Sequence, residues 1–142
     1  LMHSFKEILK NSVNGSYCIY IILVADIPAN IISWALSFFQ IISANFITLL
    51  SFILILLSAM NVINDDLLFA SISFYLAFIL DFVDGKIARL RKTSSSFGKK
   101  LDMFVDRIGF TLISLVYLVY LYKNDSLSEA WLLILYCFIF YL

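Results

Sequence analysis

Three long apolar runs constrain the fold of this chain more than any other feature of its sequence. They extend from Phe46 to about Val62, from Leu67 to about Val83, and from about Met103 to Tyr122. A mostly apolar run of about 20 residues is long enough to cross the hydrocarbon core of a bilayer as an α-helix. A helix can exist there because it satisfies all of its own backbone hydrogen bonds. The runs therefore predict an all-α fold, a polytopic transmembrane helical bundle.

The composition agrees with a membrane protein and excludes an ordinary soluble domain. Hydrophobic residues make up 63% of the chain and charged residues only 14%, whereas soluble domains average about 45–50% and about 25%. The two cysteines, Cys18 and Cys137, lie in separate apolar runs without metal-ligand spacing, which indicates free buried thiols. We expect membrane lipids as partners and no nucleic acid.

A polar stripe distinguishes the segment that precedes the first long run. Pro28 suits the first turn of a helix, and polar residues recur around it at steps of four and three. They are Asp26, Asn30, Ser33, Ser37 and Gln40. We interpret this segment as an interfacial helix lying along the membrane; a tilted span, or a stripe packed on other helices, are the alternatives. The chain then divides into an N-terminal cytoplasmic or interfacial segment, residues 1–45, and a transmembrane domain, residues 46–142.

Basic residues indicate how the bundle is oriented. The segment Lys86–Lys100 holds six lysines and arginines, whereas the loop Asn61–Asp66 holds none. Because cytoplasmic loops carry an excess of Lys and Arg, Lys86–Lys100 is expected in the cytoplasm of a multi-pass membrane protein, in the inner or plasma membrane if the source is bacterial. The last apolar run, from Ala130 to Leu142, has 13 residues, fewer than a span needs. We therefore expect the transmembrane domain to be C-terminally incomplete.

Four aspartates stand at the ends of the second and third predicted spans. They are Asp81, Asp84, Asp102 and Asp106. An aspartate within a membrane helix costs about 2.5–3.5 kcal/mol on insertion scales, so such residues are functional candidates. The first two are separated by three residues and the last two by four, so each pair lies on one helix face. The simpler interpretation of these four aspartates is that they are solvated carboxylates at helix ends.

Small residues accompany both pairs of aspartates and favour a closer arrangement. Gly85 and Ala88 share the face of the first pair, and Gly98 and Gly109 share that of the second. Small residues let two helix backbones approach closely. Four carboxylates that converge in this way repel one another unless they are protonated or neutralised by cations. Hard oxygen ligands select Mg²⁺, Mn²⁺ or Ca²⁺, and two divalent ions would balance the charge.

The same stretch carries a pattern that resembles a known signature. It reads D-x-x-D-G-x-x-A-R-x8-G-x-x-x-D-x-x-x-D and resembles the motif of the CDP-alcohol phosphatidyltransferase family. All eight fixed residues are present: Asp81, Asp84, Gly85, Ala88, Arg89, Gly98, Asp102 and Asp106. The resemblance implies a domain of six transmembrane helices, of which this chain would be a fragment.

The resemblance also implies an activity and its cofactors. Such an enzyme transfers a phosphoalcohol group, often phosphatidyl, from a CDP-alcohol such as CDP-diacylglycerol to an acceptor hydroxyl and releases CMP, in phospholipid or related polar-lipid synthesis. The resemblance implies Mg²⁺ or Mn²⁺, as two ions, on the four aspartates, and a homodimer is expected. Asp106 would also act as the general base.

A second set of residues is implied to contact the nucleotide. In the motif these are Gly85, Ala88, Arg89 and Gly98. Upstream, Ala44-Asn45-Phe46-Ile47-Thr48 resembles the Pro-Asn-x-x-Thr that opens the first span of the family, with Ala in place of Pro. Asn45 is therefore a further candidate for nucleotide binding, and a plain helix cap is its alternative role.

Two other classes of membrane protein also use intramembrane carboxylates. A Mg²⁺-dependent membrane prenyltransferase would need a DDxxD-like pattern and would leave Gly85, Ala88 and Arg89 unexplained. A non-enzymatic cation transporter would place its acidic pairs nearer the middle of the membrane, without a basic segment between them. Neither class produces CMP.

Overall fold

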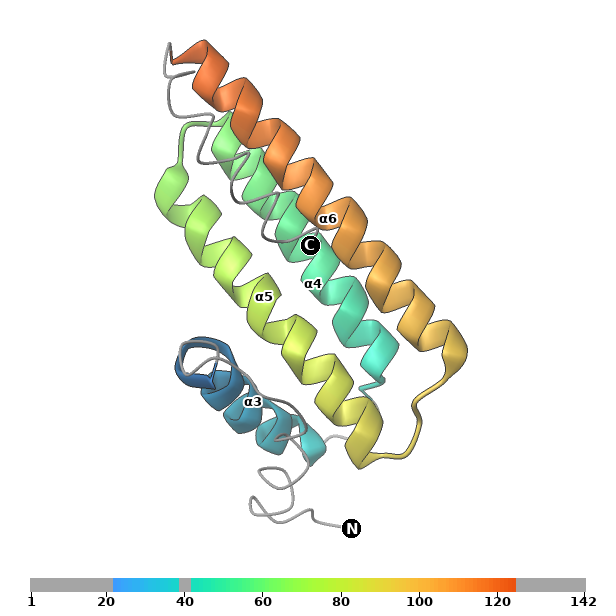
Figure 1. The fold of residues 1–142 in the computed structure, drawn as a ribbon. Helices are drawn as coiled ribbons and strands as arrows, with labels where there is room; N and C mark the ends of the chain where they lie inside the picture. Colours follow the sequence, from blue (N-terminus) through green and yellow to red (C-terminus); the bar gives the residue numbers. More distant parts are fainter. Residues whose placement is uncertain (1–21, 39–41, 125–142) are drawn as a thin grey trace.

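The structure is a computed structural model in which residues 22–38 and 42–124 are described (Figure 1). A short π-helix, η1, leads into α3, and three long helices follow. The elements are η1 (Ile22–Asp26), α3 (Ile27–Ser37), α4 (Ala44–Ile63), α5 (Leu67–Leu90) and α6 (Ser96–Lys123). The described residues contain no strand, so the predicted all-α fold is confirmed. The predictions for Cys18, Gln40, Cys137 and the last apolar run lie outside the described residues.

The three long helices form the predicted membrane bundle. Each of α4, α5 and α6 is long and apolar enough to cross a membrane. Helix α4 packs against both α5 and α6, and the three run side by side (Figure 1). Within the α4–α5 contact, the buried hydroxyl of Ser58 donates a hydrogen bond of 2.8 Å to the carbonyl oxygen of Ala70. Small and hydroxyl residues of this kind hold membrane helices together at close range.

The helices extend further into the basic segment than the apolar runs predicted. Helix α5 continues to Leu90 and α6 begins at Ser96, so only residues 91–95 connect them. The predicted ends of the spans, about Val83 and about Met103, therefore lie within the helices and do not mark where the helices end. Charged residues end the hydrophobic run but do not end a helix, because lysine and arginine are good helix formers.

Local hydrogen bonds, rather than polarity, end these helices. After α5, the amide N–H of Lys92 bonds to Arg89 O and that of Thr93 to Ala88 O, while Lys92 has a positive φ of 55°. This is a Schellman motif with lysine where glycine is usual. Helix α6 begins where the Ser95 hydroxyl accepts a hydrogen bond of 2.9 Å from the Gly98 N–H, as an N-cap does.

The N-cap of α4 differs from the predicted one. The Ser43 hydroxyl accepts a hydrogen bond of 3.2 Å from the amide N–H of Phe46, so Ser43 caps the helix and Asn45 lies within its first turn. The alternative role of Asn45 as a helix cap is therefore wrong. Its exposed side chain is left for another role.

Helix α3 turns its polar stripe inward. Asp26, Asn30 and Ser33 are buried, whereas the large apolar side chains of Ile31 and Trp34 are exposed. The stripe faces α5, on which α3 packs (Figure 1). Of the alternatives for this segment, the structure selects a polar stripe packed on another helix; its position relative to the membrane plane stays a prediction.

A close contact between α4 and α6 predicts coupling between two substitutions. A Cβ atom at Gly109 would lie 2.6 Å from Ile55 Cδ1, and the next nearest atom, Ile55 Cγ2, would be 3.5 Å away. Overpacking costs about 1–3 kcal/mol, but the far end of a flexible side chain such as Ile55 Cδ1 can shift at the lower end of this cost. Because alanine gains about 1 kcal/mol of helix propensity over glycine, we expect Gly109→Ala to be close to neutral in the wild type and stabilising by up to about 1 kcal/mol in an Ile55→Val background, which lacks Cδ1. Thermal unfolding in detergent measures both effects, and equal effects in the two backgrounds would contradict this packing.

Candidate metal and nucleotide site

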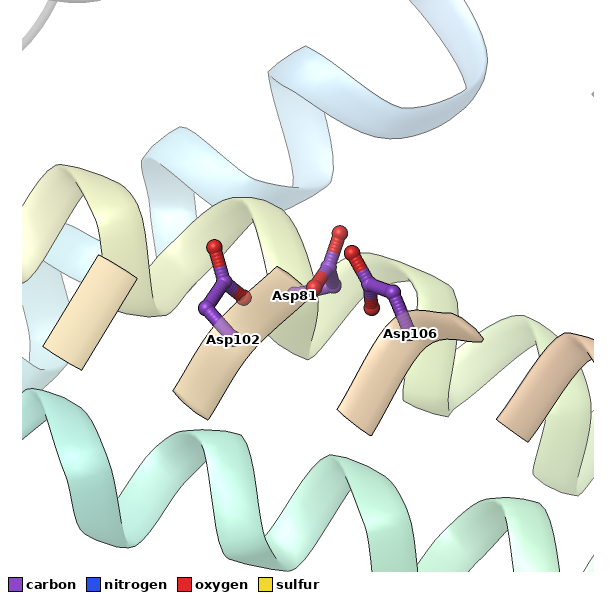
Figure 2. Close-up of side chains that lie close together, drawn as sticks. All are labelled: Asp81, Asp102 and Asp106. Carbon is purple, nitrogen blue, oxygen red and sulfur yellow. The ribbon is translucent and has the colours of Figure 1, made fainter. Parts of the chain in front are cut away.

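Three of the four predicted aspartates meet between α5 and α6. One carboxylate oxygen each from Asp81, Asp102 and Asp106 lies within 4.8 Å of the other two. Figure 2 shows Asp102 and Asp106 on successive turns of α6, facing Asp81 on α5. All three side chains are half-buried. The i,i+4 spacing places Asp102 and Asp106 together on α6. Because α4 packs against both α5 and α6, it holds this pair near Asp81.

The donor set of this cluster fits a hard divalent cation. Three carboxylates supply only oxygen ligands, which Mg²⁺ and Mn²⁺ prefer. In addition, Asp102 Oδ1 is a buried oxygen without a hydrogen-bond partner in the described part of the chain. A buried charged oxygen that lacks a partner is costly unless it is neutralised, and a metal ion would supply what the protein does not.

Asp84 is placed differently from the other three aspartates. It is buried, and its Oδ2 accepts a hydrogen bond of 2.5 Å from the hydroxyl of Thr48 on α4. It does not belong to the three-carboxylate cluster. Three residues along a helix correspond to a rotation of about 300°, so Asp81 and Asp84 point about 60° apart around α5. A role for Asp84 as a metal ligand remains a prediction.

All five residues predicted to contact the nucleotide line one pocket. This pocket, of about 160 Å³, lies between the N-terminal ends of α4 and α6 and the C-terminal end of α5. The predicted residues that line it are Asn45, Gly85, Ala88, Arg89 and Gly98. Asp84, Asp102 and Lys99 also line it, so the pocket combines acidic and basic groups.

Close packing favours glycine at one of these positions. A Cβ atom at Gly98 would lie 3.1 Å from Asn45 Oδ1 and 3.2 Å from Ser95 Oγ, which is closer than ordinary van der Waals contact. At Gly85, by contrast, the nearest atom would be Arg89 Nη1 at 3.5 Å. The first turns of α4 and α6 therefore meet across Gly98, and this contact brings Asn45 into the pocket.

A second, larger pocket contains the whole aspartate cluster in its lining. It has a volume of about 580 Å³ and lies mainly between α5 and α6. Its large apolar side chains are Ile55, Phe74, Phe78, Phe82, Met103 and Phe110. The rings of Phe74 and Phe110 meet edge to face with centroids 6.1 Å apart. Asp81, Asp102 and Asp106 all line this pocket, and Asp102 lines the smaller one as well, so a polar cavity and a mainly apolar one meet at Asp102.

Two residues near the site carried no predicted role. Thr48 forms the hydrogen bond to Asp84, and its place in the Asn45-Phe46-Ile47-Thr48 sequence was the available signal. Arg107 lines the larger pocket with Asp106, its neighbour in sequence. An arginine within a predicted span is itself a signal, because charged residues inside membrane helices are costly and usually functional.

Comparisons with known proteins identify the family of the chain. A search of curated proteins and a search of solved structures each found no match. A family model described as CDP-alcohol phosphatidyltransferase matches residues 41–141. The matched range contains the aspartate cluster and the residues that line the two pockets. The chain therefore belongs to the CDP-alcohol phosphatidyltransferase family.

Proposed function

We propose that this protein transfers a phosphoalcohol group from a CDP-alcohol donor to an acceptor hydroxyl and releases CMP. Membership of a transferase family supports the reaction class. The observation that carries the proposal is the position of Asp102, which lines both the nucleotide pocket and the apolar pocket. A donor bound across it would have its nucleotide on one side, its pyrophosphate at the carboxylates and its alcohol on the other side.

The residues of the smaller pocket would hold the nucleotide end of the donor. Arg89 lines this pocket with its planar set of N–H donors, which matches phosphate oxygens well. Gly85 and Ala88 leave room beside α5 for the ligand, and Asn45 offers an amide from α4. We propose nucleotide contacts for these four residues and for Gly98.

The carboxylates would hold the divalent metal that the family uses. Asp81, Asp102 and Asp106 supply the clustered oxygens, and we propose Asp84, which lines the nucleotide pocket, as the fourth ligand. We propose that these four aspartates together bind two ions of Mg²⁺ or Mn²⁺. Such ions, when bound, neutralise the charge that develops on the phosphate oxygens during phosphoryl transfer.

The proposed reaction is a phosphoryl transfer to the acceptor hydroxyl. The oxygen of the acceptor hydroxyl attacks the phosphorus remote from cytidine, and the bond from that phosphorus to the bridging oxygen breaks. The bridging oxygen and its electron pair leave with CMP. Asp106 accepts the proton of the acceptor hydroxyl as the general base. Its place one turn from Asp102, on the side of the larger pocket, supports this role.

The lining of the larger pocket favours a lipid donor. Aromatic and aliphatic side chains dominate it, and apolar surface of this kind packs against acyl chains through van der Waals contacts, as it would against the lipid of the bilayer. We therefore propose a diacylglycerol-type CDP-alcohol as the donor, in phospholipid or related polar-lipid synthesis. A small polar alcohol would leave most of this apolar surface without a partner.

The two alternative functions explain fewer of these observations. A prenyltransferase leaves the residues that line the nucleotide pocket, Gly85, Ala88 and Arg89 among them, without a ligand. A cation transporter needs no nucleotide pocket beside its carboxylates. The presence of Arg89 and Lys99 in the smaller pocket favours an anionic ligand over the passage of a free cation.

Release of CMP tests the proposal against both alternatives. The full-length protein in liposomes is supplied with CDP-diacylglycerol, Mg²⁺ or Mn²⁺ and a panel of acceptors that includes glycerol phosphate, inositol phosphate and serine. We expect CMP to form only when donor, metal and a suitable acceptor are all present. CMP formation that needs no acceptor would indicate hydrolysis, and failure to form CMP with any donor and acceptor would reject the proposed function.

The proposed site faces the cytoplasm, and cysteine labelling tests this orientation. The connection between α5 and α6 is basic, whereas the connection between α4 and α5 contains no lysine or arginine. In a background without Cys18 and Cys137, we expect an impermeant thiol reagent to label Asp66→Cys, but not Ser94→Cys, from outside intact cells; both positions are exposed. Labelling of Ser94→Cys alone would place the site on the outer face.

A further inference from the structure

A buried polar network joins α3 to α5 behind the nucleotide pocket. The ammonium group of Lys86 donates hydrogen bonds to Asp26 Oδ1 at 2.5 Å, to Asn30 Oδ1 at 2.6 Å and to the backbone oxygen of Asp26 at 3.1 Å. The Asn30 amide in turn donates to Asp26 Oδ2 at 3.1 Å. Lys86 is only 4% exposed and Asn30 only 2%. None of these three residues lines either pocket.

The network restricts how α3 can lie relative to α5. An ammonium group has three N–H donors, and Lys86 finds three acceptors within the network. Removing one partner of a buried ion pair strongly destabilises a protein, whereas replacing both partners by packed apolar residues often leaves its stability unchanged. A slide or rotation of α3 along α5 would therefore break several charged contacts at once. The network fixes the register between the two helices.

Further contacts hold the same two segments in this register. The Tyr75 hydroxyl donates a hydrogen bond of 2.8 Å to Val24 O in η1, and the Arg91 guanidinium donates to Leu36 O at the end of α3. Lys86 lies between these two anchors on α5. Ala29 of α3 packs in one buried cluster with Val83 and Ile87 of α5, on both sides of Lys86 in sequence.

Helix α3 supports the turn of α5 that carries residues proposed to contact the nucleotide. Asp84, Gly85 and Ala88 line the smaller pocket, while Val83, Lys86 and Ile87 of the same turn are buried in contacts with other helices. Each residue along a helix corresponds to a rotation of about 100°. A small rotation of this turn would therefore move the pocket residues away from α4 and α6.

We propose that Lys86, Asp26 and Asn30 are positioning residues for the donor site. They hold the cytoplasmic end of α5 in the one rotation that presents its pocket face to the CDP-alcohol, without touching that donor. This inference rests on the proposed transferase activity. It assigns a function in the reaction to helix α3, which lies outside the family motif and before the matched range.

A comparison of single and double substitutions separates positioning from stability. Lys86→Met and Asp26→Leu each leave one buried charge unpaired, so both are expected to lower the unfolding temperature. The double variant contains no unpaired charge and is expected to unfold near the wild-type temperature. The register then keeps its apolar contacts and the flanking hydrogen bonds of Tyr75 and Arg91 but loses the charged contacts at Lys86. Because a small misplacement of binding residues is enough to weaken a productive complex, we expect the KM for CDP-diacylglycerol to remain raised by about tenfold or more, with the KM for the acceptor nearly unchanged.

Controls make each outcome decisive. Lys100→Met removes an exposed lysine of α6 that lines neither pocket, and we expect its donor KM to equal that of the wild type. If the double variant does not fold, Asn30→Leu removes one acceptor of Lys86 and one donor to Asp26 while the Lys86–Asp26 ion pair stays intact, and a rise in donor KM is again expected. A double variant, or Asn30→Leu, that folds and has the wild-type donor KM would overturn the positioning role. Absence of CMP release by the wild type would instead reject the proposed function itself.

Discussion

Asp106→Asn is expected to lower turnover by about 100-fold or more at saturating Mn²⁺ and donor, because general base catalysis contributes about 10²–10⁴-fold. The asparagine keeps the size of the side chain and one oxygen in the cluster with Asp81 and Asp102. It cannot accept the proton of the acceptor hydroxyl. CMP release measures turnover, and isothermal titration of the donor in the presence of Mn²⁺ measures binding.

A matched substitution controls for the loss of one carboxylate. Asp66 is an exposed aspartate in the connection between α4 and α5, outside the lining of both pockets. Asp66→Asn is expected to retain wild-type turnover and binding. If Asp106→Asn also keeps near wild-type turnover across about pH 6 to 9, the assignment of Asp106 as the general base is wrong.

Asp81→Asn is expected to weaken Mn²⁺ binding by about 100-fold or more and to reduce donor binding with it. Asp81 is the one member of the cluster that α5 contributes, so its loss leaves only the two carboxylates of α6. Even outer-shell substitutions at metal sites commonly cost about 10–100-fold in affinity, and a direct ligand is expected to cost at least as much. Titration of Mn²⁺ by electron paramagnetic resonance measures the metal affinity without any substrate.

The metal dependence of the donor affinity completes this second test. For the wild type, EDTA is expected to abolish both CMP release and tight donor binding, and added Mn²⁺ is expected to restore them. For Asp81→Asn, restoration is expected only at much higher Mn²⁺ concentration. Wild-type Mn²⁺ affinity in Asp81→Asn, with Asp66→Asn as the reference, would show that the cluster is not the metal site.

The apolar runs predicted the membrane helices well but not where they end. Helices α4, α5 and α6 contain the three predicted spans, because length and hydrophobicity suffice to identify a span. Their ends depend on individual hydrogen bonds, such as the Ser95 cap. The Schellman motif after α5 uses Lys92 at a positive φ, where the expected glycine signal is absent from the sequence.

The candidate site was predicted in its residues more than in its geometry. Helical spacing brought Asp102 and Asp106 together correctly, because both belong to one helix. Asp84 is turned about 60° away from Asp81 around α5 and accepts a hydrogen bond from Thr48 on α4. That bond joins two helices and leaves no periodic trace in the sequence. Lys86 pairs with Asp26, which is 60 residues away in sequence. For the same reason this pairing could not be predicted from the local sequence pattern.

The fate of the phosphate next to the donor alcohol distinguishes phosphoalcohol transfer from every other cleavage of the donor. CDP-diacylglycerol is labelled with ³²P at the phosphorus remote from cytidine and incubated with the full-length protein, Mg²⁺ or Mn²⁺ and the acceptor that supports CMP release. We expect the label to appear in a new lipid that contains the acceptor, while the released CMP carries none, and we expect Asp106→Asn to slow the formation of both products together. Label in CMP, in inorganic phosphate or in pyrophosphate would contradict phosphoalcohol transfer.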